Sequence, residues 1–305
     1  MFLRAIHFIP ADTKIDFVSK RWFAFSVSIL LVLITIGALA TKGLNLGIDF
    51  KGGILIEAKS QQVVDTAALR DELTSLNLGE IALQQFGSPD DVLIRIQRQN
   101  GDESAQMKAI QSVRDKLGTT YEYRRVEVVG PTVGSELLHA GILATVLAML
   151  AISLYVGLRF EWQFGVAALI ATFHDVLTTV GLYAVLQLDF NLTAVAALLT
   201  LAGYSINDTV VVFDRIRETL RRQKSPDLRS IINDSVNQML SRTFMTSVTT
   251  LLALLPLLFI GGATLINFSA ALTWGIVVGT YSSIYVAAAL LIYMPPLRRI
   301  ETVKA

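Results

Sequence analysis

The sequence of 305 residues contains no cysteine and only three histidines. Without cysteine, the chain can form no disulfide framework, thiolate metal site or thiol nucleophile. An excess of one charge is also missing, because the net charge is +1, and we expect no nucleic-acid partner. Hydrophobic residues instead make up 53% of the chain, more than a soluble core of this length requires. The composition therefore favours a membrane protein.

Six apolar runs are long enough to cross a hydrocarbon layer of about 30 Å. They cover residues 23–40, 140–158, 164–188, 192–212, 244–261 and 268–293. The first run could instead be a signal peptide, because Ala38-Leu39-Ala40 resembles a cleavage site, but five further runs follow it. The predicted fold class is membrane α-helical, with six transmembrane helices.

Basic residues indicate the orientation, since cytoplasmic loops retain Lys and Arg. They gather in residues 4–21, 159, 215–229 and 298–304, whereas the short segments 187–191 and 262–267 contain none. We therefore predict a multi-pass protein of the cell inner membrane with both termini in the cytoplasm and residues 41–137 in the periplasm. The basic loop after the fourth run needs no role beyond this topology signal and contact with anionic membrane lipid.

The predicted domain organisation follows from these runs. It comprises a cytoplasmic segment (1–21), a first transmembrane helix (22–40), an extracytoplasmic domain with its linkers (41–137), five further helices (138–296) that include a cytoplasmic loop (213–242), and a cytoplasmic tail (297–305).

The polar stretch after the first run has the alternating pattern of β-strands. Candidate strands lie near residues 54–56, 80–86, 92–96 and 121–128, and amphipathic helices are predicted over 65–76 and 103–117. In the second helix, Met107, Ile110, Val113 and Leu117 are expected to face the core. The order β-α-β-β-α-β is the ferredoxin-like pattern of an α+β domain. No catalytic set of carboxylates or Ser/His/Asp is present in it, so we expect a binding or lever module, with no enzymatic activity and no cofactor.

Polar side chains interrupt the apolar runs, although each charge there costs about 2.5–3.5 kcal/mol on insertion scales. At 100° per residue they form faces on three runs, made of Thr200, Tyr204, Asn207 and Asp208 in the fourth, Arg242, Thr246, Thr249 and Thr250 in the fifth, and His174, Asp175 and Thr178 in the third. We predict a proton relay centred on Asp208 and Arg242, with Tyr204 and Asn207 beside them and His174 and Asp175 as weaker members, and no metal site.

The fourth and fifth runs are antiparallel, so Asp208 and Arg242 are expected at similar depth near the inner surface. An aspartate that pairs with arginine when ionised, and releases it when protonated, can switch the packing of two helices. Moving one charge through the membrane field supplies about 2.3 kcal/mol per 100 mV. The alternative is a static ion pair, with Arg242 extending to the headgroups.

Glycines indicate close packing or bending. Gly275 and Gly279 form a GxxxG step in the sixth run, which lets another helix approach closely. Gly130, Pro131 and Gly134 lie where the chain re-enters the membrane, and they suit either a conformational hinge or a tight turn.

Three segments together resemble the SecF branch of the bacterial SecD/SecF protein-export family, a relative of the resistance-nodulation-division transporters. They are residues 47–53 (GIDFKGG), 129–136 (VGPTVGSE) and, most specifically, 202–218 (AGYSINDTVVVFDRIRE). Residues 174–177 (HDVL) and 241–243 (SRT) also match, so the resemblance covers nearly the whole chain.

The resemblance implies a subunit that pairs with SecD and uses the proton motive force for a late step of preprotein export through the SecYEG channel, with YajC as an additional partner. It assigns the proton pathway to Asp208 and Arg242. Two alternatives remain open: half of an exporter of the related transporter class, and a purely structural translocase subunit. An intramembrane protease would need a second His or a paired acid, which the sequence does not offer around His174.

Overall fold

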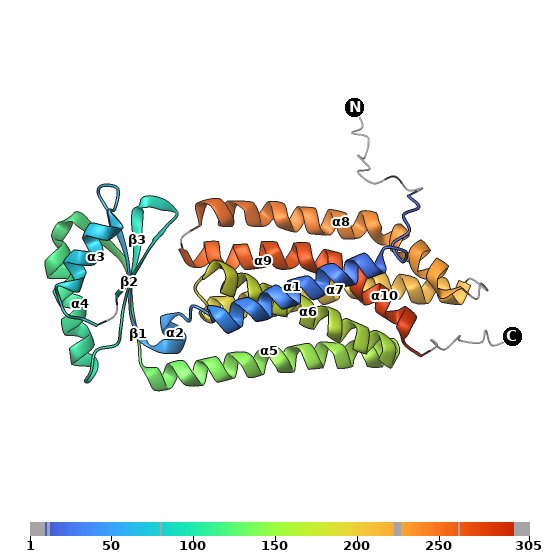
Figure 1. Cartoon of the computed structure of the whole chain (residues 1–305), viewed down its shortest axis with the longest axis horizontal. Helices are drawn as coiled ribbons and strands as arrows, with labels where there is room; N and C mark the ends of the chain where they lie inside the picture. Colours follow the sequence, from blue (N-terminus) through green and yellow to red (C-terminus); the bar gives the residue numbers. More distant parts are fainter. Residues whose placement is uncertain (1–9, 11–12, 80, 223–226, 262, 296–305) are drawn as a thin grey trace, which may run out of the picture.

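The computed structural model describes residues 10, 13–79, 81–222, 227–261 and 263–295. It is an elongated helical bundle with a small α+β domain at one end (Figure 1). The domain contains β1 (Gly53–Ser60), α3 (Thr66–Thr74), β2 (Ile81–Phe86), β3 (Ser88–Ile96), α4 (Glu103–Leu117), η1 (Gly118–Thr120) and β4 (Tyr121–Val129). The bundle and its connections contain α1 (Arg21–Thr41), α2 (Ile48–Lys51), α5 (Pro131–Arg159), α6 (Trp162–Leu186), α7 (Leu192–Arg222), α8 (Leu228–Ile260), α9 (Ala263–Ser282), η2 (Ser283–Ala287), α10 (Ala288–Leu290) and η3 (Leu291–Tyr293).

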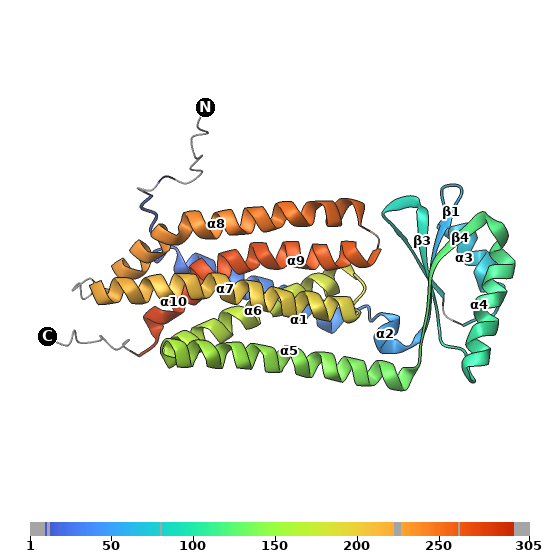
Figure 2. The same ribbon diagram turned by 180° about the vertical axis from the view of Figure 1, so that it is seen from behind.

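The domain confirms the ferredoxin-like prediction. Its antiparallel sheet has the strand order β2-β3-β1-β4, and α3 and α4 cover one face (Figure 2). Ile54 and Ile56 point to the helices and are fully buried, as alternation along β1 requires. Asp65 begins α3 by accepting hydrogen bonds from two backbone N–H groups, which an N-cap aspartate does well.

One predicted core residue of this domain is wrong. Met107 is 57% exposed, whereas Gln106 is only 3% exposed and takes the inward position beside Ile110 and Val113. The reason is a pair of hydrogen bonds between Gln106 and the backbone of Gln99, at 3.0 and 2.7 Å. A satisfied amide can be buried at little cost, so hydrophobicity alone misplaced the face by one residue.

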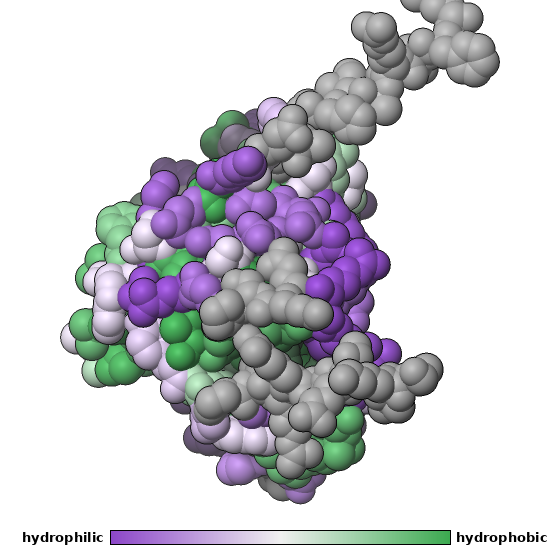
Figure 3. All heavy atoms as spheres, turned by 90° about the vertical axis from the view of Figure 1, so that its right-hand side faces the viewer, coloured by the Kyte–Doolittle hydropathy of each residue, from purple (hydrophilic) through white to green (hydrophobic). Residues whose placement is uncertain are grey.

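Six helices of the described residues are long and apolar enough to cross a membrane, which agrees with the six predicted runs. Several extend further than the runs. Because α7 continues to Arg222 and α8 begins at Leu228, most of the expected loop 213–242 is helical, and Phe213, Ile216 and Ile231 bury its inner side. Hydrophilic residues gather at this end of the molecule (Figure 3). The predicted tail 297–305 lies outside the described residues.

Residues 13–20 cross the same end of the bundle and lie against α8. The side chain of Asn237 accepts a hydrogen bond from the N–H of Ile15 at 2.9 Å and donates one to its carbonyl at 2.8 Å. Asn233, one turn earlier, accepts from the N–H of Val18 at 3.0 Å and donates to Asp16 at 2.8 Å. Two asparagines on one helix face therefore hold the backbone of the N-terminal segment.

Small residues bring the helices together. A Cβ on Gly275 would collide with Leu201 of α7, and a Cβ on Gly181 of α6 would collide with Thr35 of α1. Through this contact α1 is packed as a member of the bundle. At Gly279, a Cβ would meet α6 and α7 at ordinary contact distance. Leu201 of α7 therefore packs directly on the backbone of α9 at Gly275.

The segment predicted as a hinge or a turn starts a helix. Gly130 is extended and precedes α5, which begins at Pro131, a favoured first position because its missing N–H would have no partner there. Gly134 packs on α2, where a Cβ would lie 2.6 Å from the carbonyl oxygen of Phe50. Strand β4 thus passes into α5 through one residue.

Candidate functional site

A carboxylate without solvent exposure lies between three membrane helices. Asp175 of α6 is 0% exposed, and its Oδ2 accepts hydrogen bonds from the hydroxyls of Ser205 on α7, at 2.5 Å, and Ser282 on α9, at 2.7 Å. The Nδ1 of His174 lies 2.9 Å from Oδ1 of Asp175. Gly279 adds no side chain at this point, and a Cβ there would lie 3.5 Å from Oδ2. Asp175 thus links α6, α7 and α9.

A second polar layer lies one turn further along α7. Asp208 is 8% exposed, and its Oδ2 is buried with no hydrogen-bond partner in the described part of the chain. Beside it in sequence, the hydroxyl of Thr209 is 2.8 Å from that of Ser283. Ser283 begins η2, a π-helical turn, and such turns occur frequently at functional sites. Ser205, Asp208 and Thr209 therefore share the inner face of α7.

A third set of hydroxyls connects α7, α8 and α9. Tyr204 is half-buried, and its hydroxyl is 3.5 Å from that of Ser247 on α8. Ser247 in turn is 2.6 Å from the hydroxyl of Thr280. The buried Thr243 lies one turn from Ser247 on α8, and its hydroxyl has no partner among the described residues.

The structure separates the faces that the sequence grouped together. On α7, Thr200 and Asn207 are exposed on the outside of this chain, whereas Asp208 faces inward. Arg242 on α8 is also exposed, and none of the ion pairs of the described residues joins it to Asp208. Contact between Asp208 and Arg242 stays a prediction for another arrangement of these helices.

The arrangement provides groups that can accept and pass a proton. Carboxylates and hydroxyls follow one another along the inner face of α7 and its contacts with α6 and α9, and the Nε2 of His174 is buried without a partner among the described residues. An unpaired buried carboxylate oxygen gains most from taking up a proton, because ionisation in a medium of low polarity is costly. Asp208 has this property, whereas Asp175 is held by three donors.

The partners of Asp175 were not predicted from the sequence. Serine is too common in membrane helices for Ser205 and Ser282 to be noticed in the sequence. Their role depends on contacts between helices that are far apart in sequence. One signal was available: Ser205 lies three residues before Asp208 and four before Thr209, so these residues share a helix face.

Comparison with known proteins places this geometry in a family. The family model described as "Protein export membrane protein SecD/SecF, C-terminal" matches residues 109–296. The model described as "SecD/SecF GG Motif" matches residues 37–62. The protein translocase subunit SecF of Magnetococcus marinus is 45% identical over 97% of this chain and 94% of its own length. The SecF of Rickettsia prowazekii is 43% identical, over 95% of this chain and 94% of its own length.

Solved structures agree. The crystal structure of SecDF, a translocon-associated membrane protein from Thermus thermophilus, matches with a TM-score of 0.84 and 36% identity. The match covers 93% of this chain but 39% of the SecDF chain. SecDF in a super-membrane-facing form matches with a TM-score of 0.69. The chain therefore belongs to the SecF branch of the SecD/SecF family of protein-export membrane proteins.

Proposed function

We propose that this chain is the SecF subunit of a protein translocase, and that with SecD it uses the proton motive force to promote late steps of preprotein export through SecYEG. YajC and membrane lipid are further proposed partners. The relatives named as translocase subunits support the first part of this proposal, and they favour it over the exporter alternative. The polar cluster around Asp175 and Asp208 supports the second part.

The observation that carries the proposal is the polar outer surface of α7 and α8. Thr200, Gly203 and Asn207 are exposed along one face of α7, and Arg242 and Thr246 are exposed on α8. An arginine and an asparagine facing acyl chains would be costly, and such groups normally face a bundle interior or a water-filled cavity. A second bundle would cover this surface. The match to 39% of a SecDF chain supports SecD as the source of that bundle.

In this proposal, the conformational switch is the uptake of a proton by Asp208. The unpaired Oδ2 is ready to take up a proton, and the layer of Thr209 and Ser283 beside it can repack when the charge disappears. Arg242 would pair with the ionised carboxylate in the other state. One charge moved through the membrane field supplies about 2.3 kcal/mol per 100 mV, enough to bias two helix packings that differ by a few kcal/mol.

The orientation follows the basic residues. We place both termini in the cytoplasm and the domain of residues 41–137 in the periplasm. The end of α7 and the start of α8, within residues 213–242, would lie in the cytoplasm. The positively charged ends of α7 and α8 lie opposite the domain, as cytoplasmic segments require.

The decisive experiment replaces Asp208 with asparagine, which keeps size and polarity but cannot ionise. Release of a preprotein from membrane vesicles is measured with and without a proton motive force. We expect Asp208→Asn to abolish the force-dependent increase while leaving assembly with SecD intact. Asp71→Asn, on an exposed face of α3, removes a carboxylate elsewhere and serves as the control. Unchanged stimulation in Asp208→Asn would leave only a structural role for this subunit.

A further inference from the structure

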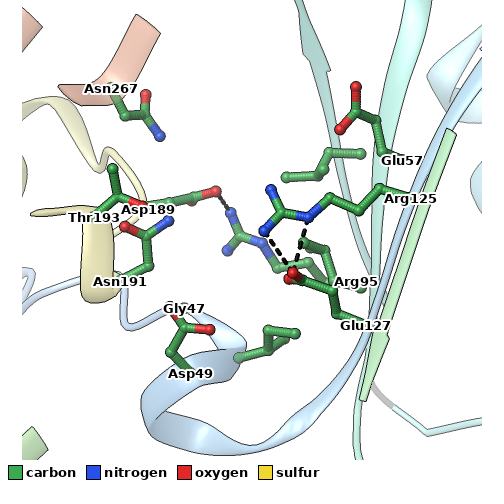
Figure 4. Close-up of a pocket in the computed structure, with 13 residues that line it drawn as sticks. Gly47, Asp49, Glu57, Arg95, Arg125, Glu127, Asp189, Asn191, Thr193 and Asn267 are labelled. Atoms are coloured by element: carbon green, nitrogen blue, oxygen red, sulfur yellow. Dashed lines mark hydrogen bonds and ion pairs between the residues drawn. The ribbon is translucent and has the colours of Figure 1, made fainter. Parts of the chain in front are cut away.

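The external domain is joined to the bundle by two chain segments. Residues 42–52 connect α1 to β1, and Gly130 alone connects β4 to α5. Beside these covalent joints, the open face of the sheet lies over the outer ends of α7 and α9 and encloses a polar cleft with them (Figure 4). The contacts within this cleft join the domain to the outer end of α7.

One contact is an ion pair between the domain and the loop before α7. Arg95 of β3 is paired with Asp189, and both side chains are largely buried, at 14% and 8% exposure. Asn45 donates to the other carboxylate oxygen of Asp189 at 3.0 Å and to the carbonyl of Gln187 at 3.1 Å. Gln84 of β2 adds a further bond to Arg95, at 3.3 Å. A buried, fully paired charge of this kind fixes one geometry, because breaking it leaves an uncompensated charge.

A second contact holds the first residue of α7. The Oδ2 of Asp49 accepts a hydrogen bond from the backbone N–H of Leu192 at 2.8 Å. A carboxylate at this position is also favoured by the helix dipole. Backbone bonds reinforce it: the N–H of Gly47 donates to the carbonyl of Phe190 at 2.8 Å, and the N–H of Phe190 donates to that of Asn45 at 2.9 Å. The outer end of α7 is thus bonded to the segment that leads into β1.

Helix α7 is continuous from this end to Asp208 and beyond. We propose that Arg95 in the external domain and Asp49 in the segment that leads into it are positioning residues that attach the outer end of α7 to this domain, so that a movement of α7 at Asp208 also moves the domain. This inference rests on the proposed function for the role of Asp208. The attachment itself is a separate claim about the orientation of the domain.

The geometry gives the size of the effect. Asp208 lies sixteen positions after Leu192, which is about 24 Å along the helix at about 1.5 Å per residue. A tilt of about 5° at Asp208 would therefore shift the outer end by about 2 Å. Hydrogen bonds tolerate only a few tenths of an ångström before they weaken. The domain must then either follow α7 or lose both contacts.

The cleft also supplies a control. Glu57 lies on β1 in the same cleft, on the same face of the sheet as Arg95 and Arg125 (Figure 4). No hydrogen bond or ion pair recorded for the described residues joins its carboxylate to the bundle. Replacing Glu57 by Gln removes a charge from the same surroundings without touching the outer end of α7.

The first measurement is the orientation of the domain in the full chain. Because the sequence has no cysteine, Lys108→Cys on α4 and Phe259→Cys on α8, both exposed, accept spin labels specifically. The distance between the labels is recorded in nanodiscs. We expect Asp49→Ala and Arg95→Gln to broaden the distance distribution. Asp49→Asn and Arg95→Lys keep an acceptor and a positive charge, and with Glu57→Gln they should keep the distribution narrow.

The second measurement is preprotein release from vesicles, with and without a proton motive force. The same two variants should lose the force-dependent part, and the conservative variants should retain it. Distributions that stay narrow in Asp49→Ala and Arg95→Gln would overturn the attachment. Broad distributions with full force-dependent release would overturn the coupling. Failure of the proposed function would be seen separately, as normal force-dependent release in Asp208→Asn with the distance results unaffected.

Discussion

Removing the carboxylate of Asp175 tests whether it holds three helices together. Asp175→Ala takes the acceptor away from Ser205, Ser282 and His174 at once. A hydrogen bond between membrane helices contributes about 0.6 kcal/mol on average and up to about 1.7, and a charged acceptor lies at the upper end of the range. We therefore expect Ser205→Ala to cost about 1–2 kcal/mol and Asp175→Ala about 2–4 kcal/mol.

The two serines should differ in how strongly they couple to Asp175. The hydroxyl of Ser282 also donates to the carbonyl of Gly279 at 3.1 Å, so it keeps a partner when Asp175 is removed. In the described part of the chain, the hydroxyl of Ser205 bonds only to Asp175. In the Asp175→Ala background, Ser205→Ala should then cost almost nothing, which gives a coupling of about 1 kcal/mol or more.

The assay is reversible unfolding of the full chain in mixed micelles of increasing detergent strength, analysed as two double-mutant cycles. Asp175 with Ser205 should give the larger coupling, and Asp175 with Ser282 the smaller one. Costs that add within about 0.5 kcal/mol in both cycles would refute the central role of Asp175.

Three further predictions concern other parts of the chain. Gly181→Ala should destabilise the protein by about 1–3 kcal/mol, because its Cβ would collide with Thr35, and detergent unfolding measures the loss. Asn237→Ala should speed protease cleavage within residues 13–20, because both bonds to the backbone there are lost. The hydrogen bond from the Ser104 hydroxyl is the largest cause that lowers the pKa of Asp102, and backbone N–H groups lower this pKa further. Ser104→Ala should therefore raise the pKa of Asp102, which an NMR titration measures. The pKa of Asp102 is lower in the folded state than in the unfolded state. The contribution of its carboxylate to folding stability is therefore present above the ordinary pKa and is lost as pH falls through the folded-state pKa.

The fold was predictable because its signals are local. Apolar runs of sufficient length gave the six helices, and alternation at Ile54 and Ile56 gave the strands. Met107 was misplaced because the favourable burial of Gln106 depends on Gln99, which lies in a preceding loop. The end of an apolar run likewise says nothing about whether the helix continues, as α7 does as far as Arg222.

The candidate site was predictable only in part. A charged residue in an apolar run is conspicuous, so Asp175 and Asp208 could be selected from the sequence. Periodicity placed Asn207 and Asp208 on one broad face, but adjacent residues on a helix point about 100° apart, and the structure puts them on opposite sides of the boundary between surface and interior. The pairing of Arg95 with Asp189 joins residues far apart in the chain, and no local pattern announces it.

The one-residue joint at Gly130 has a consequence for how the chain is made. Strand β4 is the last of the sheet, and its partner β1 lies in the sheet interior, so the domain cannot close until β4 has been synthesised. Because Gly130 alone separates Val129 from Pro131, β4 can complete the sheet only where the start of α5 lies directly beside the domain. A spacer placed after Val129 would remove this constraint.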